Sequence, residues 1–170
     1  MKPGVIALVF VPLIIILGGW QAFERSHPLD VRIVTILSVG GTEPGYNASD
    51  FILESVNGSD ITLGRITDGK AVILHFWSGD IKELTALQTV RNFYGDKVEI
   101  LAVTTGAEPV EGITFPILSD PESEVGKAYG VSALPATYFI GNDMKIFDKK
   151  EGAMTEQELN EKVKALIAVK

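Results

Sequence analysis

The stretch that most constrains the fold of this chain is Ala71–Glu83, which reads AVILHFWSGDIKE. Ala71 to Trp77 form a mainly apolar run of the length and composition typical of one buried strand. Ser78–Gly79 interrupts the run, and Asp80 then begins a helix with Glu83 three residues later, in a capping-box pattern. A helix start offers free N–H groups and the positive end of a dipole. The stretch therefore predicts an α/β fold with its candidate site at this turn.

Hydrophobic runs and turn residues predict further elements on both sides of this stretch. Asp120 followed by Pro121 is typical of a helix start, with aspartate as the N-cap and proline in the first turn. We expect a hairpin of strands 50–53 and 61–63, strands 98–103, 114–118, 136–140 and 145–148, and helices 80–94, 121–129 and 155–169. Strands that alternate with helices predict a mixed α/β domain.

The N-terminal segment is apolar enough to enter a membrane. Val5 to Trp20 contain no charged residue, and such a helix is about 24–28 Å long, near the lower limit for a bilayer. We expect residues 1–23 to form a transmembrane anchor or signal-anchor; the alternatives are a cleaved signal peptide and a buried helix. A cleavage site before Phe23 would place Trp20 where a small residue belongs. With Lys2 on the cytoplasmic side, the rest of the chain lies outside the cytoplasm.

Residues 24–46 are expected to link this anchor to a domain that spans 47–170. Within the linker, residues 31–39 are rich in β-branched and apolar side chains. This segment has two interpretations, an additional strand or an apolar face that lies close to the membrane.

Composition excludes several classes of function. A formal net charge of -7 argues against binding to nucleic acid, because few basic groups are available to neutralise phosphates. The chain contains no cysteine, which excludes disulfides, thiol catalysis and cysteine metal sites. Its two histidines, His27 and His75, are far apart in sequence. We therefore expect no metal site and no cofactor.

Several strings, in order, resemble the thioredoxin-like, membrane-anchored redoxins of the TlpA/ResA/CcmG type over residues 47–170. They are ASDFIL at 48–53, VNGSDITL at 56–63, DGKAVILHFW at 68–77 and FPILSDPESEVGKAYGVSALPATYFI at 115–140. The resemblance implies a thioredoxin-like fold, with a central mixed sheet flanked by helices. In that family the activity is thiol–disulfide exchange through a CxxC motif at the helix start.

The resemblance fails at this motif. Aligned from the Phe-Trp pair at 76–77, the two cysteine positions carry Ile81 and Leu84. An alternative alignment to peroxiredoxins places Thr85 at the reactive position. None of these side chains can form the thiolate that the family chemistry requires. We therefore expect no catalytic residue.

The proline that corresponds to the family's cis-proline is Pro135. The resemblance implies that Leu134 and Pro135 face Ile81 and Leu84 beside Trp77, in a groove that could dock an extended peptide. The alternative is that these apolar side chains only cover the core. In the same region, His75 is expected to be a buried, hydrogen-bonded histidine.

Three functions follow as hypotheses. The first is a membrane-anchored, extracytoplasmic binding module without redox activity, with a protein or peptide partner at the groove. The second, implied only by the resemblance, is a thiol–disulfide oxidoreductase of cytochrome maturation or envelope redox control. The third is a structural subunit of a membrane complex, held near the bilayer by the anchor and the 31–39 segment.

Overall fold

The structure is a computed structural model, which describes residues 34–67, 69–106 and 108–168. The anchor expected at residues 1–23 lies outside these ranges. Among the described residues, no helix has the length and apolar character needed to cross a bilayer. In chain order, the elements are β1 (Thr35–Ser38), β2 (Asp50–Glu54), β3 (Asp60–Thr62), α1 (Leu63–Ile66), β4 (Ala71–Phe76), α2 (Ile81–Tyr94), a 3-10 turn (Gly95–Lys97), β5 (Val98–Thr104), β6 (Ile117–Ser119), α3 (Glu124–Ala128), β7 (Ala136–Ile140), β8 (Ile146–Glu151) and α4 (Glu156–Ala168).

A five-stranded mixed sheet forms the centre of the domain, in the strand order β6-β5-β4-β7-β8. β4 pairs in parallel with β5 and antiparallel with β7, while β5–β6 is parallel and β7–β8 antiparallel. β4 is buried along its whole length, as its apolar run predicts. The predicted mixed sheet flanked by helices is confirmed.

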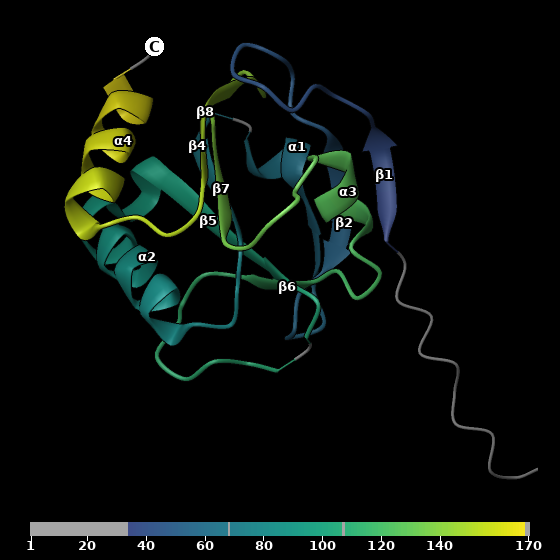
Figure 1. Cartoon of the computed structure of the whole chain (residues 1–170), viewed down its shortest axis with the longest axis horizontal. Coiled ribbons are helices and arrows are strands. Elements are labelled where there is room, and N and C mark those ends of the chain that lie inside the picture. The colour runs from purple at the N-terminus through teal and green to yellow at the C-terminus, as the bar shows by residue number, and fades with distance from the viewer. Residues whose placement is uncertain (1–33, 68, 107, 169–170) are drawn as a thin grey trace, which may run out of the picture. The chain divides into compact units, whose positions relative to one another are not determined.

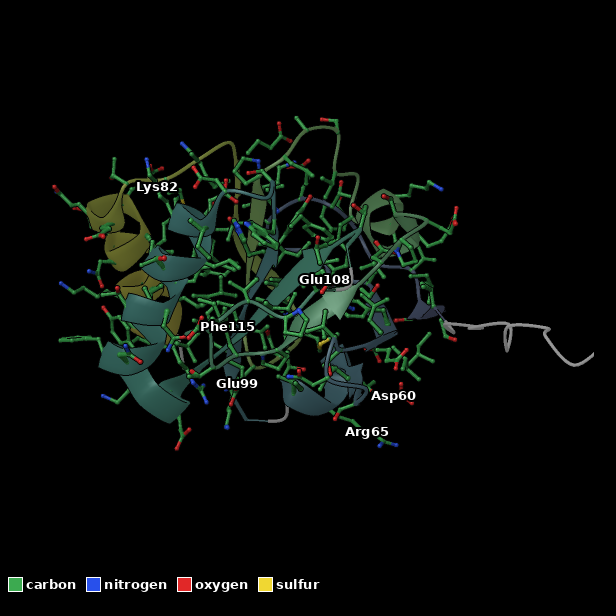
Figure 2. The ribbon with its side chains drawn as sticks, turned by 90° about the horizontal axis from the view of Figure 1, so that it is seen from below. Asp60, Arg65, Lys82, Glu99, Glu108 and Phe115 are labelled. Carbon is green, nitrogen blue, oxygen red and sulfur yellow. The ribbon has the colours of Figure 1, made fainter. Side chains whose placement is uncertain are left out.

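The side chains of β4 alternate between two hydrophobic cores, because successive residues of a strand point to opposite faces. Val72, Leu74 and Phe76 belong to the core that also contains side chains of β2 and α3. Ala71 and Ile73 belong to the core beneath α2 and α4. Figure 1 shows α2 and α4 side by side on one flank of the sheet, with β2, α1 and α3 on the other.

An additional antiparallel sheet, in the order β1-β2-β3, lies on the α3 side of the main sheet (Figure 1). β1 falls within the 31–39 segment and pairs with β2, which agrees with the strand interpretation of that segment. The predicted hairpin of 50–53 and 61–63 is present as β2 and β3. A bridge between Ser55 and Leu118, with a 2.8 Å bond from the Val56 N–H to the Ile117 carbonyl oxygen, connects the two sheets.

The elements differ from the sequence prediction at several places, among them β8, which extends to Glu151 instead of ending at residue 148. Leu63, predicted to end a strand, instead begins the short helix α1, and β6 begins at Ile117 rather than residue 114. α3 begins at Glu124, four residues after the predicted N-cap Asp120. The buried Asp120 carboxylate nevertheless accepts the first-turn N–H groups of Glu124 at 2.9 Å and Gly126 at 3.0 Å. Asp120 thus pairs with free N–H groups at the start of α3, although a turn separates it from the helix.

Candidate functional site

The turn from β4 into α2 is held by a set of local hydrogen bonds. The Trp77 backbone N–H donates to the Val103 carbonyl oxygen of β5 at 2.9 Å, and its indole Nε1 donates to the Asp80 carbonyl oxygen at 2.9 Å. Asp80 is the N-cap of α2, because its Oδ1 accepts from the Lys82 N–H at 3.0 Å. Gly79 adopts a φ of +102°, which residues with a Cβ rarely do. The predicted helix start is therefore confirmed, with a turn that requires glycine.

Glu83 does not complete a capping box with Asp80, contrary to the sequence prediction. Its Oε1 accepts from the Ser78 hydroxyl at 2.5 Å, and its Oε2 accepts from the Ser78 N–H at 3.2 Å. The same Oε2 lies 3.2 Å from His75 Nε2. The carboxylate thus joins the exposed turn to the buried strand instead of joining two positions of the helix.

His75 is buried and hydrogen-bonded, as predicted. It lies on the α2-facing side of β4, and its Nδ1 is 3.0 Å from Thr137 Oγ1 on β7. An ionised carboxylate can only accept, so Nε2 must donate to Glu83; in a neutral imidazole, Nδ1 then accepts from the Thr137 hydroxyl. Ser78, Glu83, His75 and Thr137 form a continuous polar chain, called the polar chain below.

The pKa of the Glu83 carboxyl is set by two opposing effects. Partial burial alone would raise it, but the hydrogen bonds donated by His75 and by the Ser78 hydroxyl and N–H together outweigh this effect. The pKa of Glu83 therefore lies below its ordinary value. Glu83 is held as a carboxylate that stabilises the turn, which makes it a weak proton acceptor.

The two positions that match the family cysteines have different environments. Ile81, in the first turn of α2, is 48% exposed, whereas Leu84 is 0% exposed and packs in the core beneath α2. The prediction that Leu84 lines a groove is therefore wrong. Residues three apart share a helix face, but here the first is half exposed in the first turn of the helix and the second is packed in the core. Of these two residues, only Ile81 can contact a partner.

The segment before β7 is exposed on the same side of the domain as the turn. The Leu134–Pro135 peptide bond is cis, and Leu134 is 52% exposed. The Pro135 carbonyl oxygen accepts from the Gly152 N–H at 2.8 Å. Among the described residues, no partner hydrogen-bonds to the backbone groups of Ser132, Ala133 or Leu134. These groups are thus available to another chain.

A pocket of about 360 Å³ lies between this segment, the ends of β4 and β5, and α3. Trp77 and Leu134 are the members of the predicted groove that line it; Ile81 does not. Its other apolar lining residues include Phe76, Val103 and Val131, and its polar lining residues include Thr105, Ser123 and Lys127. The groove inferred from the resemblance therefore extends toward α3 and away from α2.

Pro135 lines a different space. A cavity of about 30 Å³ borders His75, Glu83, Pro135 and Thr137 on the α2 side of the sheet. This volume suits one water molecule with several polar partners. The polar chain and the pocket thus lie on opposite sides of the cis-proline segment.

Sequence reasoning missed the polar chain and the α3 wall of the pocket. Glu83 has a better local explanation as a capping residue, and nothing in the spacing connects Thr137 to His75, which are 62 residues apart. Ser123 and Lys127 appear in the sequence as ordinary residues of a helix start. Their place in the pocket depends on the packing of α3, where the Tyr129 ring contacts Phe76 at a centroid distance of 5.6 Å.

No group of three or more histidine, aspartate or glutamate side chains in the described ranges is placed to hold a metal ion. The two acidic side chains at the turn are engaged within the domain. Asp80 caps α2, and Glu83 belongs to the polar chain. The site therefore offers a ligand apolar side chains, backbone hydrogen-bonding groups and charged side chains.

Comparisons with known proteins place this fold and site in a family. The model of the AhpC/TSA family matches residues 44–149, which is more than half of the chain. The chain belongs to the AhpC/TSA family. The match spans β2 through most of β8, and so includes both the turn and the cis-proline segment.

Relatives and solved structures agree with this assignment. The chain is 30% identical to the thioredoxin-like protein YneN of Bacillus subtilis, over 92% of this chain and 95% of YneN. It is 32% identical to the thiol-disulfide oxidoreductase ResA of Geobacillus thermodenitrificans, over 78% of this chain and 80% of ResA. The lipoprotein thioredoxin Etrx1 of Streptococcus pneumoniae superposes with a TM-score of 0.61 at 23% identity, over 69% of this chain and 99% of Etrx1. The thioredoxin-like fold is thus confirmed, in a chain that contains no cysteine.

Proposed function

We propose that this chain is a membrane-anchored, extracytoplasmic thioredoxin-like protein that binds a partner polypeptide without thiol chemistry. The observation that carries the proposal is the occupation of both family thiol positions, by Ile81 and Leu84, in a chain that has no cysteine. Attack on a disulfide needs a thiolate sulfur. With no such group, the scaffold retains only its capacity to bind.

Three features of the surface support binding of an extended segment. The backbone of Ser132–Leu134 has donors and acceptors without partners among the described residues. An incoming strand could pair with these groups, a mode of recognition in which backbone bonds supply affinity and side-chain pockets supply specificity. Leu134 exposes apolar surface in this segment, Ile81 is half exposed in the first turn of α2, and Leu134 lines the 360 Å³ pocket.

The anchor is proposed from the sequence. The uncharged run Val5–Trp20 and Lys2 before it favour a single span with the domain outside the cytoplasm. In that arrangement, the described domain follows the bilayer after a short linker. Its partner would then be a membrane protein or a protein that passes close to the membrane.

The second candidate is a thiol–disulfide oxidoreductase, which the printed name of the ResA relative favours. The absence of cysteine opposes it. A third candidate, a structural subunit, is favoured by the exposed Leu37 and Val39 at the β1 edge. An unpaired edge with apolar side chains is a common site of strand addition.

Binding is tested with a displayed library of unstructured nine-residue peptides selected on the full-length protein in detergent. Leu134→Asp removes apolar surface and places a charge beside the backbone groups, so we expect selected peptides to lose at least about tenfold in affinity. The control is Phe93→Asp, which changes another exposed apolar residue, near the far end of α2. Equal loss with the two variants, or no loss with Leu134→Asp, would contradict the proposed site.

A further inference from the structure

Exposed apolar side chains gather at one end of the described chain. Seven large hydrophobic residues are exposed in the described ranges, and three of them, Leu37, Val39 and Tyr46, fall within the ten residues 37–46. Val39 is 80% exposed and Tyr46 is 62% exposed. Single exposed apolar residues are normal on a protein surface, whereas a cluster of them indicates a contact surface. These three residues are called the β1 surface below.

The chain after β1 folds back on itself, which brings Tyr46 next to the end of the strand. The Gly41 N–H donates to the Asn47 carbonyl oxygen at 2.9 Å. The Tyr46 side chain lies directly against Gly41, where there is no space for a Cβ. Tyr46 therefore belongs to the same surface as Val39. Figure 1 shows β1 at the margin of the domain, on the flank opposite α2 and α4.

This part of the chain is nearly free of charge. Residues 34–49 include one charged residue, Glu43, although charged residues make up 22% of the whole chain. The Glu43 carboxylate is 2.6 Å from Lys149 Nζ on β8, so its charge is balanced within the domain. Natural edge strands often carry charged residues that keep other molecules away. The β1 surface lacks them, so its contact with an apolar environment requires no charge to be desolvated.

The shape of β1 disfavours a partner strand as the molecule that covers this surface. β1 has four residues, its pairing with β2 is irregular between Ile36 and Ser38, and two glycines follow at 40–41. Short and bulged edges are among the features by which proteins avoid edge-to-edge pairing. The exposed apolar side chains also continue past the strand, to Val39 and Tyr46. Contacts made by side chains therefore suit this surface better than backbone pairing.

The β1 surface follows the proposed anchor closely along the chain. If the span ends at residue 23, the eleven residues 24–34 connect it to β1 and reach at most about 40 Å. Of the described elements, β1 is the first after this connection. Aliphatic side chains and tyrosine are groups that favour the membrane–water interface. The side chains of this surface thus match the environment to which the anchor would tether them.

We infer that Leu37, Val39 and Tyr46 dock onto the surface of the bilayer in which the chain is anchored. This inference rests on the proposed anchor and specifies how the domain lies on the membrane. Docking would also hold the binding pocket near the bilayer, because Gly126 and Lys127 of α3 line the pocket and α3 lies next to β1. A partner segment just outside a membrane span would then be within reach of the pocket.

The test places a single fluorescent probe on the full-length protein, which is straightforward because the chain has no cysteine of its own. An environment-sensitive dye is attached at Ser38→Cys, an exposed position in β1, or at Thr89→Cys, an exposed position on α2 that serves as the control. Each protein is reconstituted into phosphatidylcholine vesicles that contain nitroxide-labelled phosphatidylcholine as a quencher. Flotation of the vesicles after a carbonate wash measures anchoring separately.

Docked side chains lie about 5–10 Å into the interface, so we expect the lipid quencher to lower the fluorescence at position 38 at least about twofold more than at position 89. Leu37→Asp with Val39→Asp should abolish this difference, because two carboxylates would have to be desolvated. Phe93→Asp, which changes another exposed apolar residue on α2, should preserve it. Higher salt should also preserve it, because the β1 surface carries no charge.

The outcomes separate this inference from the proposed anchor. Equal quenching at positions 38 and 89, in protein that floats with the vesicles, would overturn the inference and leave the proposed anchor in place. A difference that survives in the double aspartate variant would also overturn the inference. Spin–spin coupling between nitroxides on Ser38→Cys of two copies, without lipid quenching, would overturn it by assigning the surface to a second copy. Protein that does not float would overturn the anchor and the inference together.

Discussion

The β4–α2 turn and the Ser132–Leu134 segment are neighbours, since both contribute to one pocket, but they differ in how their polar groups are used. In the turn, the polar groups of Trp77, Asp80 and Glu83 bond to one another, to β4 or to β5. In the Ser132–Leu134 segment, the backbone groups have no partner among the described residues. The polar groups of the turn are thus engaged within the domain, whereas the backbone groups of the segment are not, and the proposed binding site lies at the segment.

The largest effect is expected from Leu84→Asp, which tests the assignment of the second thiol position to the core. A carboxylate at a side chain that is 0% exposed would lose its hydration without a partner. We expect the free energy of unfolding to fall by about 4 kcal/mol or more, or the domain not to fold. Chemical denaturation followed by circular dichroism measures this.

Ile81→Asp is the matched control for that variant, because Ile81 is half exposed in the same helical turn. We expect it to change the free energy of unfolding by no more than about 0.5 kcal/mol. Similar losses for the two variants would mean that Ile81 and Leu84 do not differ as described.

The next largest effect concerns the polar chain. His75→Ala removes a buried ring and leaves Glu83 and Thr137 without that partner, at a cost of about 2 kcal/mol in the free energy of unfolding. A double-mutant cycle with Glu83→Gln should give a coupling energy of about 1 kcal/mol. Additive effects of the two substitutions would show that the contact between His75 and Glu83 contributes nothing to the free energy of unfolding.

A smaller effect should appear in the dependence of stability on pH. The folded pKa of Glu83 lies below its ordinary value of 4.5, so the unfolded state binds the proton more tightly. The contribution of Glu83 is therefore fully present above that ordinary value and is lost as the pH falls through the lower folded pKa. Comparing wild type with Glu83→Gln between pH 7 and pH 3 measures it. Parallel stability curves for the two proteins over that range would contradict this account.

The weakest effect is expected from restoring the thiols. Ile81→Cys with Leu84→Cys should form a disulfide and gain slow dithiol exchange, because the helix start is intact. The Asp80 carboxylate beside the new thiol opposes ionisation, so adding Asp80→Asn should increase the rate. The assay is reduction of a protein disulfide by the reduced variants. Failure of the folded double variant to form its disulfide would mean that the CxxC alignment is misplaced.

The elements that follow from long local patterns could be predicted from the sequence. The apolar run of β4 and the Asp80 start of α2 were placed within one or two residues. The start of α3 was not, because the Asp120 carboxylate reaches its helix across a turn in which Ser123 adopts a φ of 54°. α1, with four residues, is too short to show a periodicity.

The site was predicted in part, for a physical reason. Trp77 and Leu134 were identified through the resemblance, and both line the pocket. Leu84 was misplaced because spacing gives the helix face that two residues share but not how deeply each side chain is buried. The partners of Glu83 come from tertiary packing, which spacing along one helix does not contain.

The most direct test of the central claim is the rate at which the full-length wild type reduces a protein disulfide in the presence of an electron donor. The account predicts a rate equal to that of the buffer blank, while the variant with cysteines at positions 81 and 84 exceeds it. Turnover by the wild type would contradict the claim that this scaffold binds without thiol chemistry.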